Sequence, residues 1–330
     1  MASHPPPSRS DAQHSPLRIV FMGTPALAAY ILERLADAAG PDFQIVAVIT
    51  RSDQPRKRGL KLEPSEVGAV AQRRGLTTLK PAKIRTPEFL AELKSFAPDL
   101  IVIAAYGRIL PNPVLEAARI MPINVHASLL PRHRGAAPVE GAILAGDAES
   151  GVTIMRVTER MDAGPILLQR AIPIAADETQ GTLKEKIAEL GAAALLEALL
   201  LIQRGELHEM PQDDNLATYT SPVAKEHAVI DWESDADQIE RMVRAYDPWP
   251  VARTTLGGED LLIWRAKAVA DPQAAEVTAG TIVRLKPEPV VKCGSGSLVL
   301  LEAQAPGRKR MPAADFFRGK RVALGARLGS

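Results

Sequence analysis

Short apolar runs rich in β-branched residues alternate with helical patterns through the first part of the chain. The apolar runs predict buried strands, which fall at residues 17–22, 43–50, 100–105, 120–126, 152–157 and 166–174. Helical patterns lie between them, at residues 27–35, 64–74, 87–96, 113–118 and 182–203. Alternating strands and helices are typical of an α/β domain. We therefore expect a Rossmann-like, mostly parallel sheet with helices on both faces.

The pattern changes towards the C-terminus. Residues 211–222 are polar and flanked by prolines, which indicates a linker. After a helical stretch at residues 236–245, short apolar runs are separated by glycines and prolines, at residues 261–264, 281–285, 290–292 and 297–301. This texture predicts a small β-barrel or sandwich. The expected division is a disordered tail (1–16), an α/β domain (17–206), a linker (207–225) and a smaller C-terminal domain (226–330).

Composition narrows the class of protein. The 330 residues are 46% apolar and 24% charged, as in a globular protein of two domains with substantial cores. A single cysteine, Cys293, excludes an internal disulfide framework and a thiolate metal cluster. No apolar stretch is long enough to cross a bilayer, and the tail has no apolar core typical of a secretory signal. We expect a cytoplasmic protein with no membrane partner and, as the simplest assembly, a monomer.

Two local clusters of basic residues stand out against a net charge of only +1. One lies near the C-terminus and contains a single acid, Asp315; its basic members are Arg308, Lys309, Arg310, Arg318, Lys320, Arg321 and Arg327. The other comprises Arg51, Arg56, Lys57, Arg58 and Lys61. Such patches can hold a phosphate backbone, although each alone is equally typical of a solvated face.

The turn after the first strand, Gly23-Thr24-Pro25, lacks the glycines of a dinucleotide-binding fingerprint. A tight strand-to-helix turn explains it better, so NAD binding is not expected. More informative is the end of the strand at 120–126, where Asn124 and His126 point to the same side because strand side chains alternate. Ligands of α/β sheets bind beyond the carboxyl ends of the strands. A functional pair and a hydrogen-bonded structural pair both fit this pattern.

Asp162 follows a later strand, in an Asp-Ala-Gly turn that taken alone is usually only a turn. If the two strands are neighbours, its carboxylate can reach His126. An amide, an imidazole and a carboxylate suit acyl transfer to an amine: Asn124 and a His126 N–H can donate to the oxyanion, and Asp162 can orient the ring or relay a proton. The sequence has no Gly-x-Ser-x-Gly nucleophile motif, and its other histidines lack metal-ligand spacing, so no metal is expected.

These residues resemble the formyltransferases that use 10-formyltetrahydrofolate. The shared pattern is Asn-x-His-x-Ser-Leu-Leu-Pro followed by Asp-x-Gly, which the chain matches from Asn124 to Pro131 and from Asp162 to Gly164. The resemblance implies that Asn124, His126 and Asp162 are catalytic. It also implies a folate site formed by Ser128, Leu129, Leu130, Pro131, Tyr106 and Gly107.

Within this family the chain is most similar to the members that formylate initiator methionyl-tRNA. The stretches at residues 21–25 and 131–138 resemble theirs, and residues 53–61 resemble an inserted basic loop that contacts the tRNA, with Arg58 as its recognition arginine. Residues 56–61 read Arg-Lys-Arg-Gly-Leu-Lys where the family commonly has Ala-Gly-Arg-Gly-Lys-Lys. The resemblance also implies an oligonucleotide-binding (OB)-like β-barrel as the C-terminal, tRNA-binding domain. The expected tRNA contacts are Arg56, Lys57, Arg58, Lys61, Arg308, Lys309 and Arg310.

Four other functions compete with this one. A formyltransferase acting on a small sugar amine, or a hydrolase of 10-formyltetrahydrofolate, would use the same three residues but would not need the basic loop and tail. A non-catalytic RNA-binding module would need the basic patches but not Asn124, His126 and Asp162. A nicotinamide oxidoreductase is the most distant alternative, because its fingerprint is absent.

Overall fold

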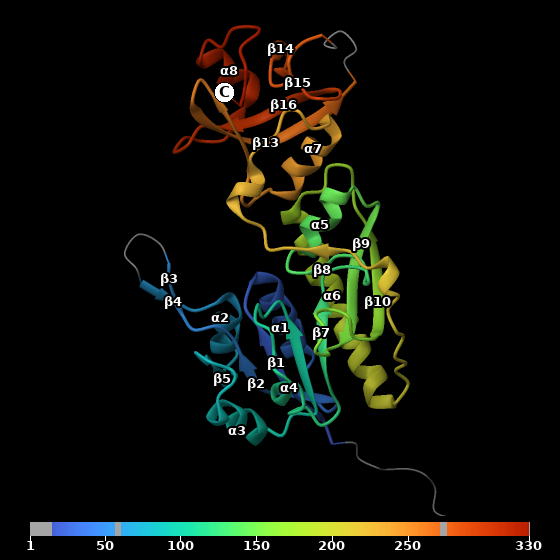
Figure 1. The fold of residues 1–330 in the computed structure, drawn as a ribbon. Coiled ribbons are helices and arrows are strands. Elements are labelled where there is room, and N and C mark those ends of the chain that lie inside the picture. Colours follow the sequence, from blue (N-terminus) through green and yellow to red (C-terminus); the bar gives the residue numbers. More distant parts are fainter. Residues whose placement is uncertain (1–14, 57–60, 271–275, 330) are drawn as a thin grey trace, which may run out of the picture.

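The computed structural model describes residues 15–56, 61–270 and 276–329. The chain forms two lobes stacked along one axis, with β1 to α6 in one and α7 to α8 in the other (Figure 1). Almost all of the predicted tail, residues 1–16, falls outside the described residues. No described helix combines the length and the apolar character that crossing a membrane requires.

The first lobe is built on a sheet of seven strands in the order β10-β9-β7-β6-β1-β2-β5. Its strands, in chain order, are β1 (Leu17–Gly23), β2 (Phe43–Ile49), β5 (Thr78–Leu79), β6 (Leu100–Ala104), β7 (Met121–His126), β9 (Glu149–Arg156) and β10 (Ile166–Pro173). From β5 to β7 all neighbours are parallel, whereas β9 runs antiparallel to both β7 and β10. The predicted mostly parallel sheet is confirmed.

Helices cover both faces of this sheet, as the alternating pattern predicted. One face carries the larger core, formed with α1 (Ala26–Ala38), α2 (Glu66–Arg73), α5 (Pro138–Ala145) and the long α6 (Gln180–Arg204). The opposite face packs against α3 (Pro87–Ser95) and α4 (Asn112–Leu115). The helix predicted at residues 113–118 is shorter than expected. The chain leaves it early because the backbone of Arg119 and Ile120 bonds to the carbonyl groups of Pro98 and Asp99.

Two small pairs of strands lie outside the main sheet. The β3 (Gln54–Arg56) and β4 (Lys61–Glu63) strands form a hairpin that projects away from the lobe (Figure 1). The other pair, β8 (Arg134–Gly135) and β11 (Tyr219–Thr220), is parallel and joins segments far apart in the chain. The predicted linker region therefore contributes a strand to the first lobe. It also contains a short 3-10 helix, η1 (Asp214–Leu216), and a second one, η2 (Lys225–Ala228), begins at its last residue.

The second lobe is an antiparallel β-domain with its own core, as the apolar runs predicted. Its elements are α7 (Ala236–Ala245), β12 (Ala252–Leu256), β13 (Glu259–Val269), β14 (Ile282–Arg284), β15 (Val290–Lys292), β16 (Ser297–Gln304), β17 (Met311–Pro312) and α8 (Ala313–Gly319). The strand order is β12-β13-β16-β15-β14, with β17 beside β16. Bridges from Arg327 to Thr281 and from Leu328 to Leu256 connect the two edges of this sheet, so the C-terminal segment closes it in the manner of a barrel.

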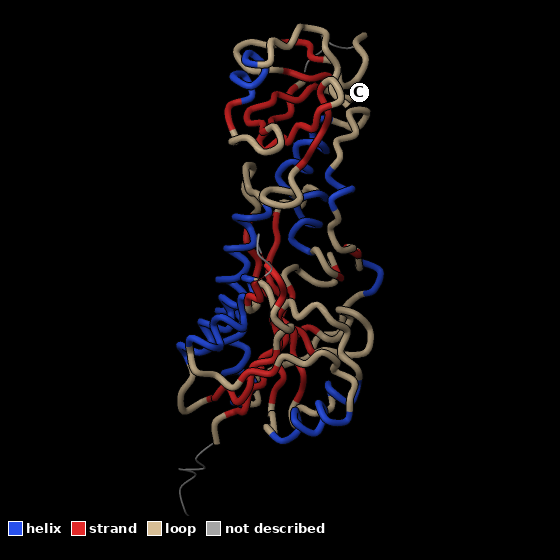
Figure 2. The backbone as a smooth tube through the Cα atoms, turned by 90° about the vertical axis from the view of Figure 1, so that its left-hand side faces the viewer, coloured by secondary structure: helices blue, strands red, loops and turns tan. Residues whose placement is uncertain are grey.

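The two lobes meet where α7 packs on α5 (Figure 1), and helices lie at this junction in the view turned by 90° (Figure 2). The Arg241 side chain donates to the Leu144 carbonyl oxygen at 3.2 Å. The Gly181 N–H, at the start of α6, donates to the Asp247 carbonyl oxygen at 3.0 Å. The Tyr246 side chain, at the end of α7, is buried in the core of the first lobe. These contacts fix the β-domain against the first lobe.

Candidate active site

Asn124 and His126 lie at the carboxyl end of β7, between β6 and β9. Asn124 is aligned with Ile103 of β6, and His126 with Thr153 of β9. The strand is apolar because its neighbours bury it on both sides, so two polar side chains at its end need a specific environment. The His126 ring is buried and Asn124 is partly buried.

One nitrogen of the His126 ring has a fixed partner. Nε2 lies 3.0 Å from the His133 carbonyl oxygen, which can only accept a hydrogen bond. Nε2 must therefore carry a proton, and in the neutral ring the lone pair is on Nδ1. His133 directs its carbonyl towards His126 from a left-handed backbone conformation, with φ of 58°. Its own ring is held by Asp147, with Nε2 at 2.6 Å from the carboxylate.

The Asp162 carboxylate faces the other ring nitrogen. Its Oδ2 atom lies 3.8 Å from His126 Nδ1 and accepts a hydrogen bond from the Gly135 N–H at 2.8 Å. At 3.8 Å the two groups do not form a direct hydrogen bond. The structure thus brings together the histidine and the carboxylate that the sequence placed on separate segments.

Burial and charge act in opposite directions on this histidine. Burial lowers the pKa of His126 below its ordinary value, while the Asp162 carboxylate and the His133 carbonyl partly offset that effect. The ring is therefore neutral near pH 7, with its lone pair directed to the side where the Asp162 carboxylate lies. Such a ring can take a proton from a group that reaches Nδ1, and the nearby carboxylate then stabilises the resulting cation.

The Ser-Leu-Leu-Pro turn that follows β7 is organised around Thr153 of β9. The Thr153 hydroxyl donates to the Ser128 carbonyl oxygen at 2.7 Å and accepts from the Leu130 N–H at 3.1 Å. The Gln169 amide donates both to this hydroxyl, at 3.0 Å, and to the Leu130 carbonyl oxygen, at 2.7 Å. Thr153 is fully buried, so the turn is fixed from inside the sheet.

Two side chains of this turn, those of Ser128 and Leu130, make contacts inside the protein. The Ser128 hydroxyl donates to the Arg132 carbonyl oxygen at 2.7 Å. Leu130 forms a small apolar cluster with Met155 and Ile166. The peptide bond between Leu130 and Pro131 is cis, and Leu129 is partly buried.

Tyr106 and Gly107 follow β6, the strand next to β7. The Tyr106 ring is buried, burial raises the pKa of its phenol, and its hydroxyl has no hydrogen-bond partner among the described residues. Gly107 adopts φ of 74°, and the Arg51 guanidinium donates to its carbonyl oxygen at 3.0 Å. The left-handed backbone favours glycine at this position, whereas the nearest atom to an added Cβ, Arg51 Nη2 at 2.8 Å, belongs to an exposed side chain that can move aside. A buried hydroxyl without a partner is a feature that a polar ligand could satisfy.

The expected tRNA contacts fall at two separate places. Lys57 and Arg58 lie outside the described residues; Arg56 and Lys61 belong to β3 and β4, but their side chains are not among those described. Arg308, Lys309 and Arg310 are exposed in the turn between β16 and β17. Of these three, Arg310 is already engaged, stacked 4.8 Å from the centre of the Trp264 ring and paired with Glu302.

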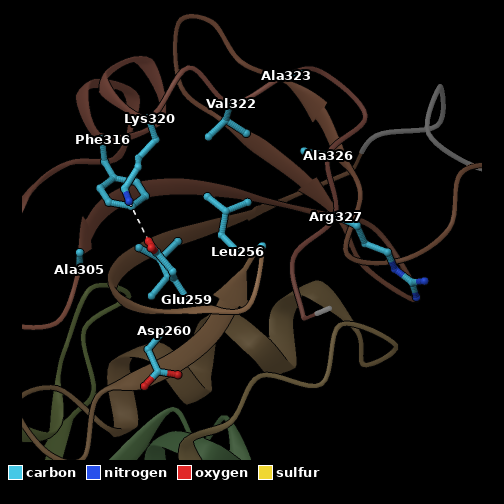
Figure 3. Close-up of a pocket in the computed structure, with 12 residues that line it drawn as sticks. Leu256, Glu259, Asp260, Ala305, Phe316, Lys320, Val322, Ala323, Ala326 and Arg327 are labelled. Atoms are coloured by element: carbon cyan, nitrogen blue, oxygen red, sulfur yellow. Dashed lines mark hydrogen bonds and ion pairs between the residues drawn. The ribbon is translucent and has the colours of Figure 1, made fainter.

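A cavity of about 440 Å³ lies apart from the catalytic group, in the C-terminal domain (Figure 3). Its walls include Leu256, Phe316 and Val322, and an ion pair of 2.7 Å joins Lys320 to Glu259. None of its lining residues belongs to the groups that the sequence singled out as catalytic or folate-binding. Across the described parts of the chain, no group of three or more His, Cys, Asp or Glu side chains could hold a metal ion.

Two side chains to which the sequence pattern gave no role lie against the Asp162 turn. The Gln212 amide donates to the carbonyl oxygens of Asp162, at 2.9 Å, and Gly164, at 2.6 Å. The Arg134 guanidinium, fully buried, donates to the Gln212 oxygen. Arg134 belongs to the stretch at 131–138 that carried part of the resemblance, but a glutamine in a polar linker gives no signal of its own.

Comparisons with known proteins show the family to which the chain belongs. Residues 17–199 match the formyl transferase family, and residues 222–321 match the formyl transferase C-terminal domain family. The methionyl-tRNA formyltransferase of Nitrosospira multiformis is 45% identical over 304 residues, which cover 92% of this chain and 96% of the relative. That of Pseudomonas syringae pv. tomato is 46% identical over 317 residues, with coverage of 95% and 99%. The chain belongs to the methionyl-tRNA formyltransferase family.

Solved structures share the fold at lower identity. The N-formyltransferase of Helicobacter canadensis, in complex with folinic acid and dTDP-3-aminofucose, aligns with a TM-score of 0.64 and 18% identity, covering 86% of this chain and 98% of that one. HypX of Aquifex aeolicus, in complex with tetrahydrofolic acid, aligns with a TM-score of 0.61 and 18% identity, covering 94% of this chain and 48% of that one. The arrangement of the two lobes therefore recurs in other proteins.

Proposed function

We propose that this protein transfers a formyl group from 10-formyltetrahydrofolate to the amino group of initiator methionyl-tRNA, as a step of translation initiation. The observation that carries the proposal is the buried His126, with Nδ1 towards the Asp162 carboxylate, in a chain that methionyl-tRNA formyltransferases match over nearly its whole length. Residues 17–206 would hold the catalytic domain, and residues 226–330 would bind tRNA.

The roles of the catalytic residues follow from the fixed ring of His126. Because Nε2 donates to His133, the neutral ring offers Nδ1 as an acceptor and not as a donor. The amine of methionine attacks the formyl carbon, and His126 Nδ1 takes the proton that the amine releases. The bond from the formyl carbon to N10 of the folate then breaks, and the same proton passes to that nitrogen. Asp162 stabilises the transient imidazolium.

Asn124 is the donor left for the oxyanion. Its side chain lies on the same side of β7 as His126, and its amide N–H groups can bond to the oxygen that gains charge when the amine attacks. This assignment differs from the expectation that a His126 N–H shares that role, since only a protonated ring would have an N–H at Nδ1.

Two features favour a tRNA over a small amine as acceptor. The identity of about 45% with the curated methionyl-tRNA formyltransferases extends through the C-terminal domain. That domain exposes Arg308 and Lys309 in one turn, and the projecting β3–β4 hairpin carries further basic residues. Likeness to the aminosugar enzyme is limited to the fold, at 18% identity.

The test is formylation with four acceptors: charged initiator tRNA, free methionine, a dTDP-aminosugar and buffer alone. We expect formyl-methionyl-tRNA to be the product, and His126→Ala to lower its rate by about 10²- to 10⁴-fold, as for loss of a general base. Folate consumed equally without tRNA would support a hydrolase, and a rate with the aminosugar equal to that with tRNA would support the small-amine alternative.

A further inference from the structure

The segment between the two domains lies against the turn that contains Asp162. Residue Met210 pairs with Ile166, with reciprocal backbone bonds of 2.8 and 2.9 Å. Ten residues on, β11 pairs with β8, where the Arg134 N–H donates to the Thr218 carbonyl oxygen at 2.8 Å. At Gly135 the two strands approach so closely that an added Cβ atom would lie 2.2 Å from the Thr220 carbonyl oxygen. The chain from 210 to 220, here called the linker segment, is thus anchored at both ends on the first lobe.

Gln212 of the linker segment uses its whole amide to hold the turn of Asp162. Its two N–H groups are directed to two carbonyl oxygens, those of Asp162 and Gly164. Its oxygen accepts from Nε and Nη2 of Arg134, at 3.0 and 2.7 Å. A primary amide has two donor hydrogens and two acceptor lone pairs, so this side chain is fully satisfied and has one orientation.

Arg134 connects Gln212 to the other support of the carboxylate. Its guanidinium, with 0% of its surface exposed, also donates to an Asp214 carboxylate oxygen at 2.8 Å. The next residue, Gly135, donates its N–H to Asp162 Oδ2. A buried cation is costly unless it is paired, and here the partners that satisfy it come from the linker segment.

Asp162 needs such support because its backbone is in the left-handed region, with φ of 50°. Non-glycine residues keep that conformation only where the surroundings determine it. Here the Asp162 carbonyl is held by Gln212 and its carboxylate by Gly135, and together they set the direction in which the carboxylate faces His126.

We propose that Gln212 and Arg134 are positioning residues that hold the Asp162 carboxylate towards His126, so that the linker segment between the domains is part of the catalytic site. The inference rests on the proposed function, in which that carboxylate stabilises the protonated ring. It assigns to Gln212 a role in turnover and not in binding of either substrate.

The decisive variant is Gln212→Glu, because a glutamate still accepts from Arg134 but cannot donate to the two carbonyl oxygens. A displaced catalytic group costs about 10- to 100-fold in rate, so we expect kcat to fall by that factor. We expect KM for methionyl-tRNA to change by less than about twofold. Gln203→Glu, the same chemical change near the end of α6, is the matched control and should keep wild-type kinetics.

A purely structural role of Gln212 would not make the effect of Gln212→Glu on kcat depend on Asp162, so this dependence is the readout. In an Asp162→Asn background, Gln212→Glu should lower kcat no further, because residues acting as a unit are not additive. In the single variant, the acid limb of the pH profile of kcat/KM should move to lower pH, since a displaced carboxylate no longer raises the pKa of His126. A full additional loss in the double variant, or an unmoved limb, would overturn the inference.

A second variant covers the case in which the charge at position 212 disrupts folding. Gln212→Met has similar length and no charge. It leaves buried donors and acceptors without a partner, so its thermal unfolding midpoint should fall, but at temperatures where it is folded it should show the same fall in kcat. Loss of folding in both variants would make the role structural and overturn the inference. If wild-type protein formylates the tRNA and Gln212→Glu keeps its rate, only this inference fails. If wild-type protein does not formylate the tRNA, the proposed function itself fails.

Discussion

At the scale of single residues, the protonation state of His126 is determined by the groups that surround its ring. The ring is buried, its Nε2 proton is committed to His133, and its pKa is lowered chiefly by burial. In the unfolded chain the same ring titrates at about 6.5. Between that pH and the lower folded pKa, the unfolded state binds more protons, so acidification favours unfolding.

The pH dependence of stability therefore has a component that belongs to His126. That component is fully present above about pH 6.5 and is lost as pH falls towards the folded pKa, at up to about 1.4 kcal/mol per pH unit. We expect His126→Gln to lose less stability than the wild type between neutral and mildly acidic pH, as measured by urea unfolding at each pH. His208→Gln, at an exposed position, is the control. Equal slopes for His126→Gln and wild type would contradict the assignment.

At the scale of elements, the folate-binding turn predicted after β7 depends on a neighbouring strand. Thr153 is in the middle of β9, in a stretch that is otherwise apolar, and its hydroxyl satisfies the Ser128 carbonyl and the Leu130 N–H. The β9 strand thus supplies, through the Thr153 hydroxyl, the hydrogen-bond partner that these two backbone groups need. The turn would lose both bonds if that hydroxyl were removed.

Thr153→Val is the direct test, because valine has the same shape without the hydroxyl. Leaving buried backbone groups unsatisfied costs about 1–3 kcal/mol each, so we expect a comparable loss of unfolding free energy. We also expect a higher KM for 10-formyltetrahydrofolate, measured at saturating tRNA. Thr158→Val, at a position beyond the end of β9, should alter neither quantity. An unchanged KM would separate this turn from the folate site.

The same elements show what the sequence could and could not predict. The strands β1, β2, β6 and β7 follow from apolar runs whose burial is a local property, and Asn124 and His126 follow from their place at a strand end. Gln212 could not be predicted, because its contact with Asp162 spans 50 positions and depends on how the linker segment packs. The role of Thr153 could not be predicted for a similar reason. Threonine is common in strands, so its presence there indicates nothing more until the segment next to it is known.

At the scale of the whole molecule, the two basic regions are carried by different lobes. The β3–β4 hairpin projects from the first lobe, while Arg308 and Lys309 are exposed on the second (Figure 1). The packing of α7 on α5 holds the lobes together, with Arg244 of α7 donating to the Glu178 carbonyl oxygen at 3.1 Å.

Removing two of these charges should weaken tRNA binding in a salt-dependent way. For Arg308→Ala combined with Lys309→Ala, we expect the slope of log Kd against log salt to fall by about 0.7–0.9 for each phosphate that the protein no longer neutralises. The measurement is a titration of labelled tRNA at several salt concentrations. Lys94→Ala on α3, at the far end of the first lobe, should leave the slope unchanged (Figure 1). An identical slope for the double variant would exclude this turn from the interface.

The path of the linker segment has a consequence for any attempt to separate or exchange the lobes. The two family matches end at residue 199 and begin again at residue 222, which makes the stretch between them look like a free place to cut or to join. A fragment that ended there would lose Asp214, the counter-charge of the Arg134 guanidinium, and Gln212, whose amide holds the Asp162 turn. Chimaeras should therefore inherit residues 210–220 from the parent that supplies β8, whichever parent donates the barrel.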